Sequence, residues 1–389
     1  MESKSNTLAF FGCWGDKGNK TSQCNPVTNH IKDTDYSAVI IAGDNYYVDK
    51  RKVNGDKYKY FNVEEVENIF NCLPIDKPIY MLTGNHEYDV LKKKKSIFNG
   101  KDFNDENQFD ECAVLKEELN QVGRRQLQPA TQIYFDTIKF NNHMIKNGVL
   151  FLFIDSTMYE YNPTDSLKCY DVLLGEDSSN LLELRQRQQE ILHRVVQMTT
   201  DEYKSIVMCA HHPLIIFRKK TKKEKITREP IKFNKPLLDL VRVLGTGTDK
   251  ITYLCADFHV YQHCLITLPE LIIDHHVVGT GGTELDELLT VDEIQTTEIP
   301  EQESPAQEPE IGEHIQALDT EKSMVLLDGI NVQLLGGIVS DGLLEVTIDD
   351  SDVECNFISL SSPNGGRKSR RKRKRARRTR RYSKYSRAY

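Results

Sequence analysis

The residues Ala38-Val39-Ile40-Ile41-Ala42-Gly43-Asp44-Asn45-Tyr46-Tyr47 show the pattern from which the architecture of this chain can be inferred. This stretch begins as a continuous apolar run of strand length, which is typical of a strand buried on both faces. A glycine and a polar block follow at once, so the carboxylate of Asp44 is expected to project from the end of that strand. The stretch therefore predicts a central parallel strand whose carboxyl end carries polar, chemically active side chains.

The same arrangement of an apolar run followed by a polar block recurs along the chain. In open α/β sheets, ligands gather at the carboxyl ends of the strands. We therefore expect the polar blocks to meet at one rim of the fold. The four further blocks are Gly12-Cys13-Trp14-Gly15-Asp16, Gly84-Asn85-His86-Glu87, Ala210-His211-His212-Pro213 and Ala256-Asp257-Phe258-His259.

Apolar runs and amphipathic helical patterns alternate through the first two thirds of the chain. This order predicts an α/β layer structure with parallel strands at its centre. The expected strands are 8–12, 38–42, 79–82, 149–154, 206–210 and 251–255, and the expected helices, from apolar residues at three- and four-residue spacing, are 63–72, 106–122, 179–198 and 235–244.

The later segments follow one another without helices, which predicts a second, mostly antiparallel sheet. The fold class that we expect is α/β, with two stacked mixed β-sheets flanked by helices. The later strands are expected at 262–268, 271–279, 343–348 and 353–360.

Charge is arranged in blocks along the 389 residues. The net charge is −7, yet residues 367–389 contain 14 Lys and Arg and no acid. Such a run repels itself and buries no apolar area, so we expect a catalytic domain at 1–362 and a disordered basic tail at 363–389. Residues 292–315 are rich in Glu and Pro, which predicts an acidic loop within the domain.

No apolar stretch is long enough to cross a bilayer, and the N-terminus lacks the apolar core of a signal peptide. These features predict an intracellular protein, cytoplasmic or nuclear, without a membrane partner. The nine cysteines are odd in number and scattered, and several lie in apolar runs such as 206–210. We expect buried thiols rather than a disulfide framework.

The polar blocks contain the residue types that hold a pair of metal ions. Hydrolysis of a phosphate ester near neutral pH needs a strong nucleophile and neutralisation of oxyanion charge, and two cations supply both. Asp44 is the natural bridging ligand, because each carboxylate oxygen can bind one cation. Tyr47, as a phenolate, is a hard donor suited to trivalent iron. Taken alone, this block also fits a strand followed by an Asn-containing turn.

The Gly-Asn-His-Glu block offers an amide oxygen and an imidazole. Asn85 is expected to bind the second metal. His86, on the same turn, points elsewhere and suits a proton donor to the leaving oxygen, with Glu87 orienting it. A polar turn in which His86 is satisfied by its neighbours is the alternative.

The last two blocks supply nitrogen and oxygen ligands. His211 is expected on the second metal, and His212 is expected to face the other way, because a strand sends successive side chains to opposite faces. Asp257 and His259 are two residues apart, so they share a face if the chain stays extended. Each would then reach one of the two metals. The ordinary interpretation of the nearby His263, His275 and His276 is that they are strand residues without a special role.

The order Asp44-x-x-Tyr47, Asn85-His86-Glu87, His211 and His259 resembles the calcineurin-like metallophosphoesterase superfamily, and within it the purple acid phosphatase branch, over residues 8–283 and 340–360. Tyr47 is the residue that discriminates the branch. The resemblance implies a four-layer sandwich and two metal ions, iron with zinc, manganese or a second iron. It also implies an acid phosphatase-like enzyme that hydrolyses a phosphomonoester rather than a phosphodiester.

Two departures from the family pattern alter the expected ligand set. The family has an Asp on the first metal where this chain has either Cys13, directly after the strand, or Asp16, within Gly15-Asp16-Lys17-Gly18. Both registers stay open. Asp257 stands where the family has a His on the second metal, while His259 keeps the place of a first-metal ligand. A thiolate would favour softer metals, and a carboxylate would favour manganese or magnesium.

The sequence thus predicts metal-dependent hydrolysis of a phosphate ester, with metal ligands among Cys13, Asp16, Asp44, Tyr47, Asn85, His211, Asp257 and His259 and catalytic roles for Asp44 and His86. The altered motifs support a second hypothesis, a degenerate and inactive phosphatase fold that acts as a binding or scaffold protein. The basic tail would bind nucleic acid or another polyanion through phosphate charge in either case.

Overall fold

The structure is a computed structural model. It describes residues 6–15, 24–53, 56–89, 91, 96–98, 101–102, 111–128, 132–135, 143–159, 169–170, 180–217, 231–282, 286, 288, 316–319, 324–327 and 330–360.

The first large sheet has six strands in the described part of the chain. The strands β1, β2, β5 and β8 are parallel neighbours, and β20 pairs antiparallel with β1 on its other side. In sheet order the strands are β21 (Asp352–Ser359), β20 (Gly342–Asp349), β1 (Thr7–Phe11), β2 (Ala38–Ala42), β5 (Pro78–Leu82) and β8 (Gln132–Phe135).

The second large sheet has nine described strands. Here β10, β11, β14 and β16 are parallel neighbours, and antiparallel strands flank them on both sides. In sheet order the strands are β17 (Gln316–Asp319), β18 (Met324–Leu327), β19 (Ile330–Ile338), β15 (Tyr261–Thr267), β16 (Ile272–Val278), β14 (Lys250–Cys255), β11 (Ser205–Cys209), β10 (Val149–Phe153) and β9 (His143–Lys146).

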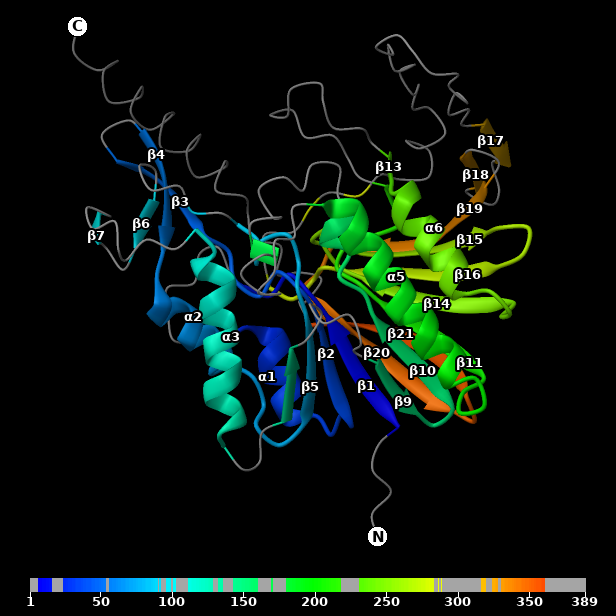
Figure 1. The fold of residues 1–389 in the computed structure, drawn as a ribbon, viewed down its shortest axis with the longest axis horizontal. Coiled ribbons are helices and arrows are strands. Elements are labelled where there is room, and N and C mark those ends of the chain that lie inside the picture. Colours follow the sequence, from blue (N-terminus) through cyan, green and yellow to red (C-terminus); the bar gives the residue numbers. More distant parts are fainter. Residues whose placement is uncertain are drawn as a thin grey trace, which may run out of the picture.

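Helices cover the outer faces of the two stacked sheets. In Figure 1, α1 (Pro26–Asp33), α2 (Val63–Phe70) and α3 (Ala113–Gln126) lie on one side, and α5 (Leu181–Met198) and α6 (Lys235–Leu244) lie on the other. The smaller elements are β12 (Ile215–Phe217) paired with β13 (Ile231–Phe233), the sheet β3 (Asp49–Val53), β4 (Asp56–Phe61), β6 (Ser96–Phe98) and β7 (Lys101–Asp102), and a short helix at Thr157–Tyr159.

Alternating side chains of the central strands fill two cores. Leu8 and Phe10 of β1 belong to a buried cluster that also contains Phe151 of β10, so this cluster lies between the sheets. Ala9 and Phe11 belong to the cluster that includes the buried residues of the helices. The predicted fold class, two mixed sheets flanked by helices, is confirmed.

The expected grouping of the later strands is wrong in one respect. The late segments do not form a sheet of their own within the described residues. Instead β15 and β16 extend the sheet of β14, whereas β20 and β21 extend the sheet of β1. The physical reason is that the early strands of each sheet leave an exposed edge, and a late strand covers it by hydrogen bonding: β20 lies antiparallel to β1, and β16 lies parallel to β14.

Asparagine side chains begin four of the helices. Asn25, Asn62, Asn180 and Asn234 each accept a hydrogen bond from a backbone N–H in the first turn of α1, α2, α5 and α6. This capping explains why these helices begin where they do, because it satisfies a donor that the helix leaves unpaired. Helix α6 matches its predicted range of 235–244 at both ends, and α5 starts two residues later than predicted.

The cysteines correct the prediction of thiols only. Cys24 is bonded to Cys72, and Cys112 to Cys169. Cys13, Cys209, Cys255 and Cys264 are buried free thiols as expected, and Cys355 is a half-buried one. The expectation of free thiols is wrong for the four bonded cysteines. They lie near helix ends and not in apolar runs, so the tertiary packing of the helices determines which of them are close enough to bond.

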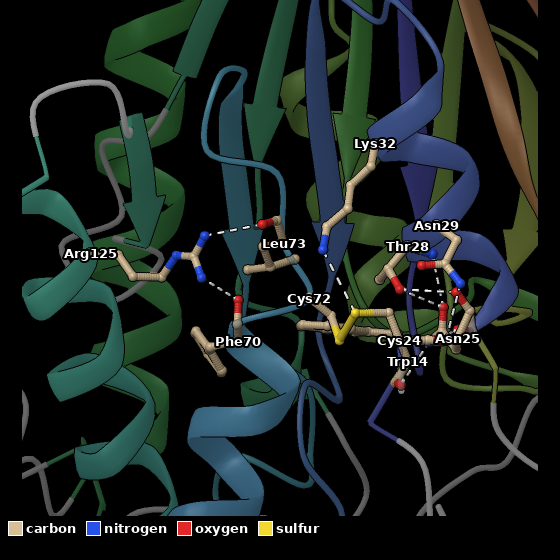
Figure 2. The surroundings of a disulfide bond; sticks show 11 residues. Trp14, Cys24, Asn25, Thr28, Asn29, Lys32, Phe70, Cys72, Leu73 and Arg125 are labelled. Carbon is tan, nitrogen blue, oxygen red and sulfur yellow. Dashed lines mark hydrogen bonds between the residues drawn. A yellow bond between two sulfur atoms is a disulfide. The ribbon is translucent and has the colours of Figure 1, made fainter. Parts of the chain in front are cut away.

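The Cys24–Cys72 bond ties the start of α1 to the end of α2 (Figure 2). Next to it, Asn25 donates its side-chain amide to the carbonyl of Trp14 at 3.4 Å. On the other side, the guanidinium of Arg125 donates to the carbonyls of Phe70 at 2.5 Å and Leu73 at 3.0 Å. The bond therefore lies within a network that joins β1, α1, α2 and α3.

No helix in the described part of the chain is both long and apolar enough to cross a membrane. The acidic loop predicted at 292–315 and the basic tail predicted at 363–389 lie outside the described residues. The division of the chain at 362 stays a prediction.

Replacing both Cys24 and Cys72 by serine is expected to lower the free energy of unfolding by about 2–4 kcal/mol, because the bond restrains the unfolded chain across a sequence separation of 48. Chemical denaturation followed by circular dichroism measures the change. Cys355→Ser is the control and should leave the midpoint almost unchanged. A count of nine alkylated thiols in the unreduced, unfolded protein would contradict the bond.

Candidate metal centre

The carboxyl ends of strands from both sheets meet at one rim. Gly12, directly after β1, has no room for a side chain, because a Cβ there would collide with Ala42 at the end of β2 and with Ala256 after β14. The backbone N–H of Gly12 donates to the carbonyl of Val278 in the other sheet at 3.0 Å. The rim is thus the place where the two sheets are joined by backbone hydrogen bonds.

Three polar residues at this rim have left-handed backbone conformations. The φ angles are 54° at Cys13, 54° at Asp44 and 60° at Asp257. Non-glycine residues adopt this region rarely and at a cost of about 1 kcal/mol or more each, and such residues cluster at functional sites. The three turns direct their side chains toward one volume instead of continuing the alternation of the strands.

The carboxylate of Asp44 lies at the centre of this volume. It is almost completely buried. Its Oδ1 accepts from the backbone N–H of His86 at 3.0 Å and lies 3.3 Å from Nε2 of His211. Its Oδ2 accepts from the thiol of Cys13 at 3.9 Å. Burial raises the pKa of Asp44, but His211, His86 and the His86 N–H outweigh it, so the pKa is lowered overall.

On one side of Asp44 lie a thiol, a phenol and an imidazole. The hydroxyl of Tyr47 is 3.1 Å from Nε2 of His259. Burial, and then the charge of Asp44, raise the pKa of the Cys13 thiol and of the Tyr47 phenol well above their usual values. Both groups therefore hold their protons at neutral pH unless a cation offsets the burial.

On the other side of Asp44 lie Asn85, His211 and Asp257. Nε2 of His211 is 3.1 Å from the side-chain oxygen of Asn85 and 3.9 Å from Oδ1 of Asp257. The other ring nitrogen of His211 donates to the carbonyl of Ala42 at 2.6 Å, so Nε2 is the atom that faces these oxygens and that can bind a metal ion once it has lost its proton. A side chain at Gly84 would collide with Asp44 and His211, so only glycine fits there.

His212 does not face away from the site as predicted. Ligand atoms of His211, His212 and Asp257 all lie within 4.8 Å of one another, and the two imidazole rings are perpendicular. The alternation of side chains along a strand does not apply to these two histidines, because β11 ends at Cys209.

The prediction that the chain stays extended from Asp257 to His259 is also wrong, although both side chains reach the site. The chain turns at Asp257 rather than staying extended. As a result Asp257 approaches His211 on one side of Asp44, and His259 approaches Tyr47 on the other. The backbone N–H of His259 donates to Asp286, which fixes the turn. Asp16 lies outside the described residues, so of the two candidates for the first ligand the structure describes Cys13 alone.

His86 is oriented by Asp89, not by Glu87 as predicted. Nδ1 of His86 lies 2.8 Å from Asp89, which also forms a salt bridge of 2.7 Å with Lys59. Burial raises the pKa of Asp89, but its hydrogen bond with His86 and the charges of His86 and Lys59 lower the pKa by more. The result is a pKa of about 2. The His86 ring packs on Tyr47, with ring centroids 4.5 Å apart. This leaves Nε2 of His86 as the nitrogen that is not used by Asp89.

Glu87 instead holds the backbone of two turns. Its carboxylate accepts from the N–H groups of Asp44 at 2.9 Å and Asn45 at 2.6 Å, and from that of Gly84. Burial is the main cause that raises the pKa of Glu87, to about 7. Glu118 of α3, fully buried beside it, has its pKa raised well above the usual value by burial and by Glu87.

Asn45 links this carboxylate pair to the first turn. Its side-chain amide donates to Glu118 at 3.2 Å, and its oxygen accepts from the indole N–H of Trp14 at 2.8 Å. Sequence reasoning missed Trp14, Asn45, Glu118 and Asp89 as supports. Only Asn45 and Trp14 carried a signal, since both lie within the polar blocks.

The donor set fits metal ions. Oxygen, nitrogen and sulfur donors converge in one volume. Ligand atoms of Cys13, Asp44 and His211 lie within 4.8 Å of one another, and so do those of His211, His212 and Asp257. The two oxygens of Asp44 face different groups, with His211 near Oδ1 and Cys13 near Oδ2. The buried carboxylate of Asp44 and the half-buried one of Asp257, with the raised pKa of Cys13 and Tyr47, make positive charge the natural complement of the site.

Comparison with known proteins finds a match in sequence. The sequence model described as calcineurin-like phosphoesterase matches residues 7–243, which is more than half of the chain. The block with Asp257 and His259 lies beyond the matched residues. No curated protein matches the chain in sequence.

Three solved structures are similar to this chain at low identity. GAP50, the anchor in the inner membrane complex of Plasmodium, is 11% identical with a TM-score of 0.45, covering 92% of this chain and 86% of that one. Purple acid phosphatase PPD1 from yellow lupin (Lupinus luteus) seeds is 14% identical with a TM-score of 0.44, covering 92% and 52%. PhoD is 13% identical with a TM-score of 0.40, covering 92% and 72%.

Replacing Glu87 by alanine is expected to lower the free energy of unfolding by about 3 kcal/mol or more, because three buried N–H groups lose their acceptor. Urea denaturation measures the change. Glu64→Ala, at an exposed position of α2, is the control and should stay within about 0.5 kcal/mol of the parent. Equal midpoints for the two variants would show that Glu87 does not hold the turns.

Proposed function

Because this chain belongs to the calcineurin-like phosphoesterase family, we propose that it hydrolyses a phosphate ester at the rim around Asp44. One observation carries the proposal. Donor atoms of Cys13, Asp44 and His211 lie within 4.8 Å of one another, and the same holds for His211, His212 and Asp257. Cys13, Tyr47 and His259 would hold one cation next to Asp44, and Asn85, His211 and Asp257 would hold another, because Cys13 approaches Oδ2 of Asp44 and His211 approaches Oδ1.

The bound cations would supply a nucleophile at neutral pH and neutralise charge on the phosphoryl oxygens. The protein contributes a rigid set of ligands. Asp44 and His211 are buried, whereas the side chains of His86 and Asp257 are 21% and 16% exposed. The substrate therefore approaches from the side of His86, and the buried ligands form the floor of the site.

His86 is the proton donor in this proposal. Asp89 holds its Nδ1, so Nε2 can deliver a proton to the leaving oxygen. The negative charge of Asp89 stabilises the protonated imidazole that this role requires. Tyr47 packs on the ring of His86 and limits its rotation.

A phosphomonoester is the proposed substrate class, and iron with zinc, manganese or a second iron is the proposed metal pair. Tyr47 supports both, because a phenolate suits trivalent iron and this residue marks the purple acid phosphatase branch. Cys13 adds a soft donor next to it. Asp257 places a carboxylate among the imidazoles, which favours manganese over zinc on that side.

The compartment and the partners of the tail also stay proposals. The polyanion-binding role of the basic tail is unchanged by the structure, since 363–389 lies outside the described residues. Two disulfides are more typical of proteins in oxidising compartments. They weigh against a reducing cytosol as the location of the folded protein.

Asp44→Asn is expected to lose both bound metal and hydrolysis of a chromogenic phosphomonoester, because it removes the shared carboxylate. Elemental analysis and absorbance assays measure the two effects. Asp33→Asn, at an exposed site on α1, is the control and should match the parent. His86→Gln should keep its metal while losing activity by about 10²–10⁴-fold. Stoichiometric metal in the parent without turnover of any ester would favour the scaffold hypothesis instead.

Asp89→Asn is expected to move the alkaline limb of the pH–rate profile to lower pH. The carboxylate of Asp89 favours the protonated form of His86, so without it the proton donor loses its proton at lower pH. Lys59→Gln removes a positive charge beside the same pair, so it should move the limb to higher pH. An alkaline limb that neither variant moves would exclude His86 as the proton donor.

A further inference from the structure

A second cluster of ligand-type side chains lies away from the rim, on strands β15 and β16. It consists of His263, Asp274 and His276. His263 is directly opposite His276 in the antiparallel register, and Asp274 is two residues before His276. Residues two apart on a strand share a face, as do opposed residues of neighbouring strands, so all three side chains lie on one face of the sheet.

The donor atoms of the cluster have the separations of ligands on one ion. Oδ1 of Asp274 is 2.7 Å from Nε2 of His263 and 3.2 Å from Nε2 of His276. The two rings are stacked, with centroids 4.1 Å apart and 13° between their planes. Two atoms bound at about 2.0–2.1 Å to a tetrahedral ion are about 3.3 Å apart. The three atoms therefore need little movement to bind one ion.

His276 provides an independent sign of a ligand. Its side chain is 2% exposed, yet Nε2 has no hydrogen-bond partner within the described residues. The approach to Asp274 has the distance of an ion pair without the alignment of a hydrogen bond. Buried polar nitrogens are satisfied in nearly all proteins, so this one needs a partner.

Neighbouring residues orient the cluster as outer partners orient a metal site. The other nitrogen of His276 is 3.3 Å from the hydroxyl of Tyr261, which can hold a proton on that nitrogen so that Nε2 carries the lone pair. Lys250 forms a salt bridge of 3.1 Å with Oδ2 of Asp274. Oδ1 is thereby left to face the two imidazoles.

The cluster is open on one side. The side chains of His263 and Asp274 are 27% and 20% exposed. Gly336 of β19 is opposite His263, and a Cβ placed there would meet no heavy atom within 4 Å. A hydrated ion can reach the site over this glycine and keep a water molecule as its remaining ligand.

We propose that Nε2 of His263, Oδ1 of Asp274 and Nε2 of His276 bind one divalent transition-metal ion of the zinc class. Two imidazoles and one carboxylate suit zinc, nickel, copper or ferrous iron, not calcium or magnesium. A network of hydrogen bonds alone accounts for the cluster less well. Such a network would require Nε2 of His263 and Nε2 of His276 both to carry a proton and to donate to Oδ1 of Asp274. The buried Nε2 of His276 is not aligned for that bond.

Zinc content tests this proposal in the full chain. The protein is loaded with Zn²⁺, desalted and measured by elemental analysis. The variants are His263→Ala and Asp274→Asn, and His193→Ala on α5 is the matched control. Each cluster variant should contain one zinc fewer per chain than the parent, and the control should equal the parent.

The same substitutions in a chain with Asp44→Asn and His211→Ala separate this site from the rim. There we expect one zinc per chain, lost on addition of His263→Ala. Tyr261→Phe keeps the ring that stacks on Phe357 and removes the hydroxyl. In competition with a chromophoric chelator, it should weaken zinc binding about tenfold. The proposal would be overturned if folded His263→Ala contained as much zinc as the parent. It would also be overturned if Tyr261→Phe kept full zinc affinity and the chain with Asp44→Asn and His211→Ala contained no zinc.

Discussion

The buried carboxylate of Asp44 determines how the site is built. A charge without solvent must be compensated by donors or cations at close range. The protein places the His86 N–H, the His211 imidazole and the Cys13 thiol around it. Those donors come from the ends of β1, β5 and β11, so the compensation of one charge also aligns strands from both sheets.

The support for this arrangement reaches far from the site. Glu87 fixes the turns that carry Asp44 and Gly84, and Asn45 connects Glu118 with the indole of Trp14. The carbonyl of Trp14 accepts from Asn25, the residue after Cys24 in the disulfide. A continuous set of contacts thus leads from the rim to the Cys24–Cys72 bond. The strained conformations at the rim persist because these contacts over-determine them.

The sequence predicted the strands and the rim because both depend on local order. Apolar runs such as 38–42 set the buried strands, and each polar block follows its run directly. It did not predict contacts that depend on how loops and outer elements pack. The partner of Glu87, the direction of His212 and the pairing of Cys24 with Cys72 all arise after a strand or helix has ended, where alternation no longer holds. Likewise, His263 and His276 look like ordinary strand residues until the register of β15 on β16 sets them opposite each other.

The most direct test of the central claim is a crystal structure of the full chain grown with manganese or with iron and zinc, with anomalous data at each metal edge. We expect two peaks at the rim, each within bonding distance of a different oxygen of Asp44. One would also contact Tyr47 and His259, and the other Asn85 and His211. Peaks that lie beyond bonding distance of Asp44, or no peak at the rim under saturating metal, would contradict the binding of two metal ions around Asp44.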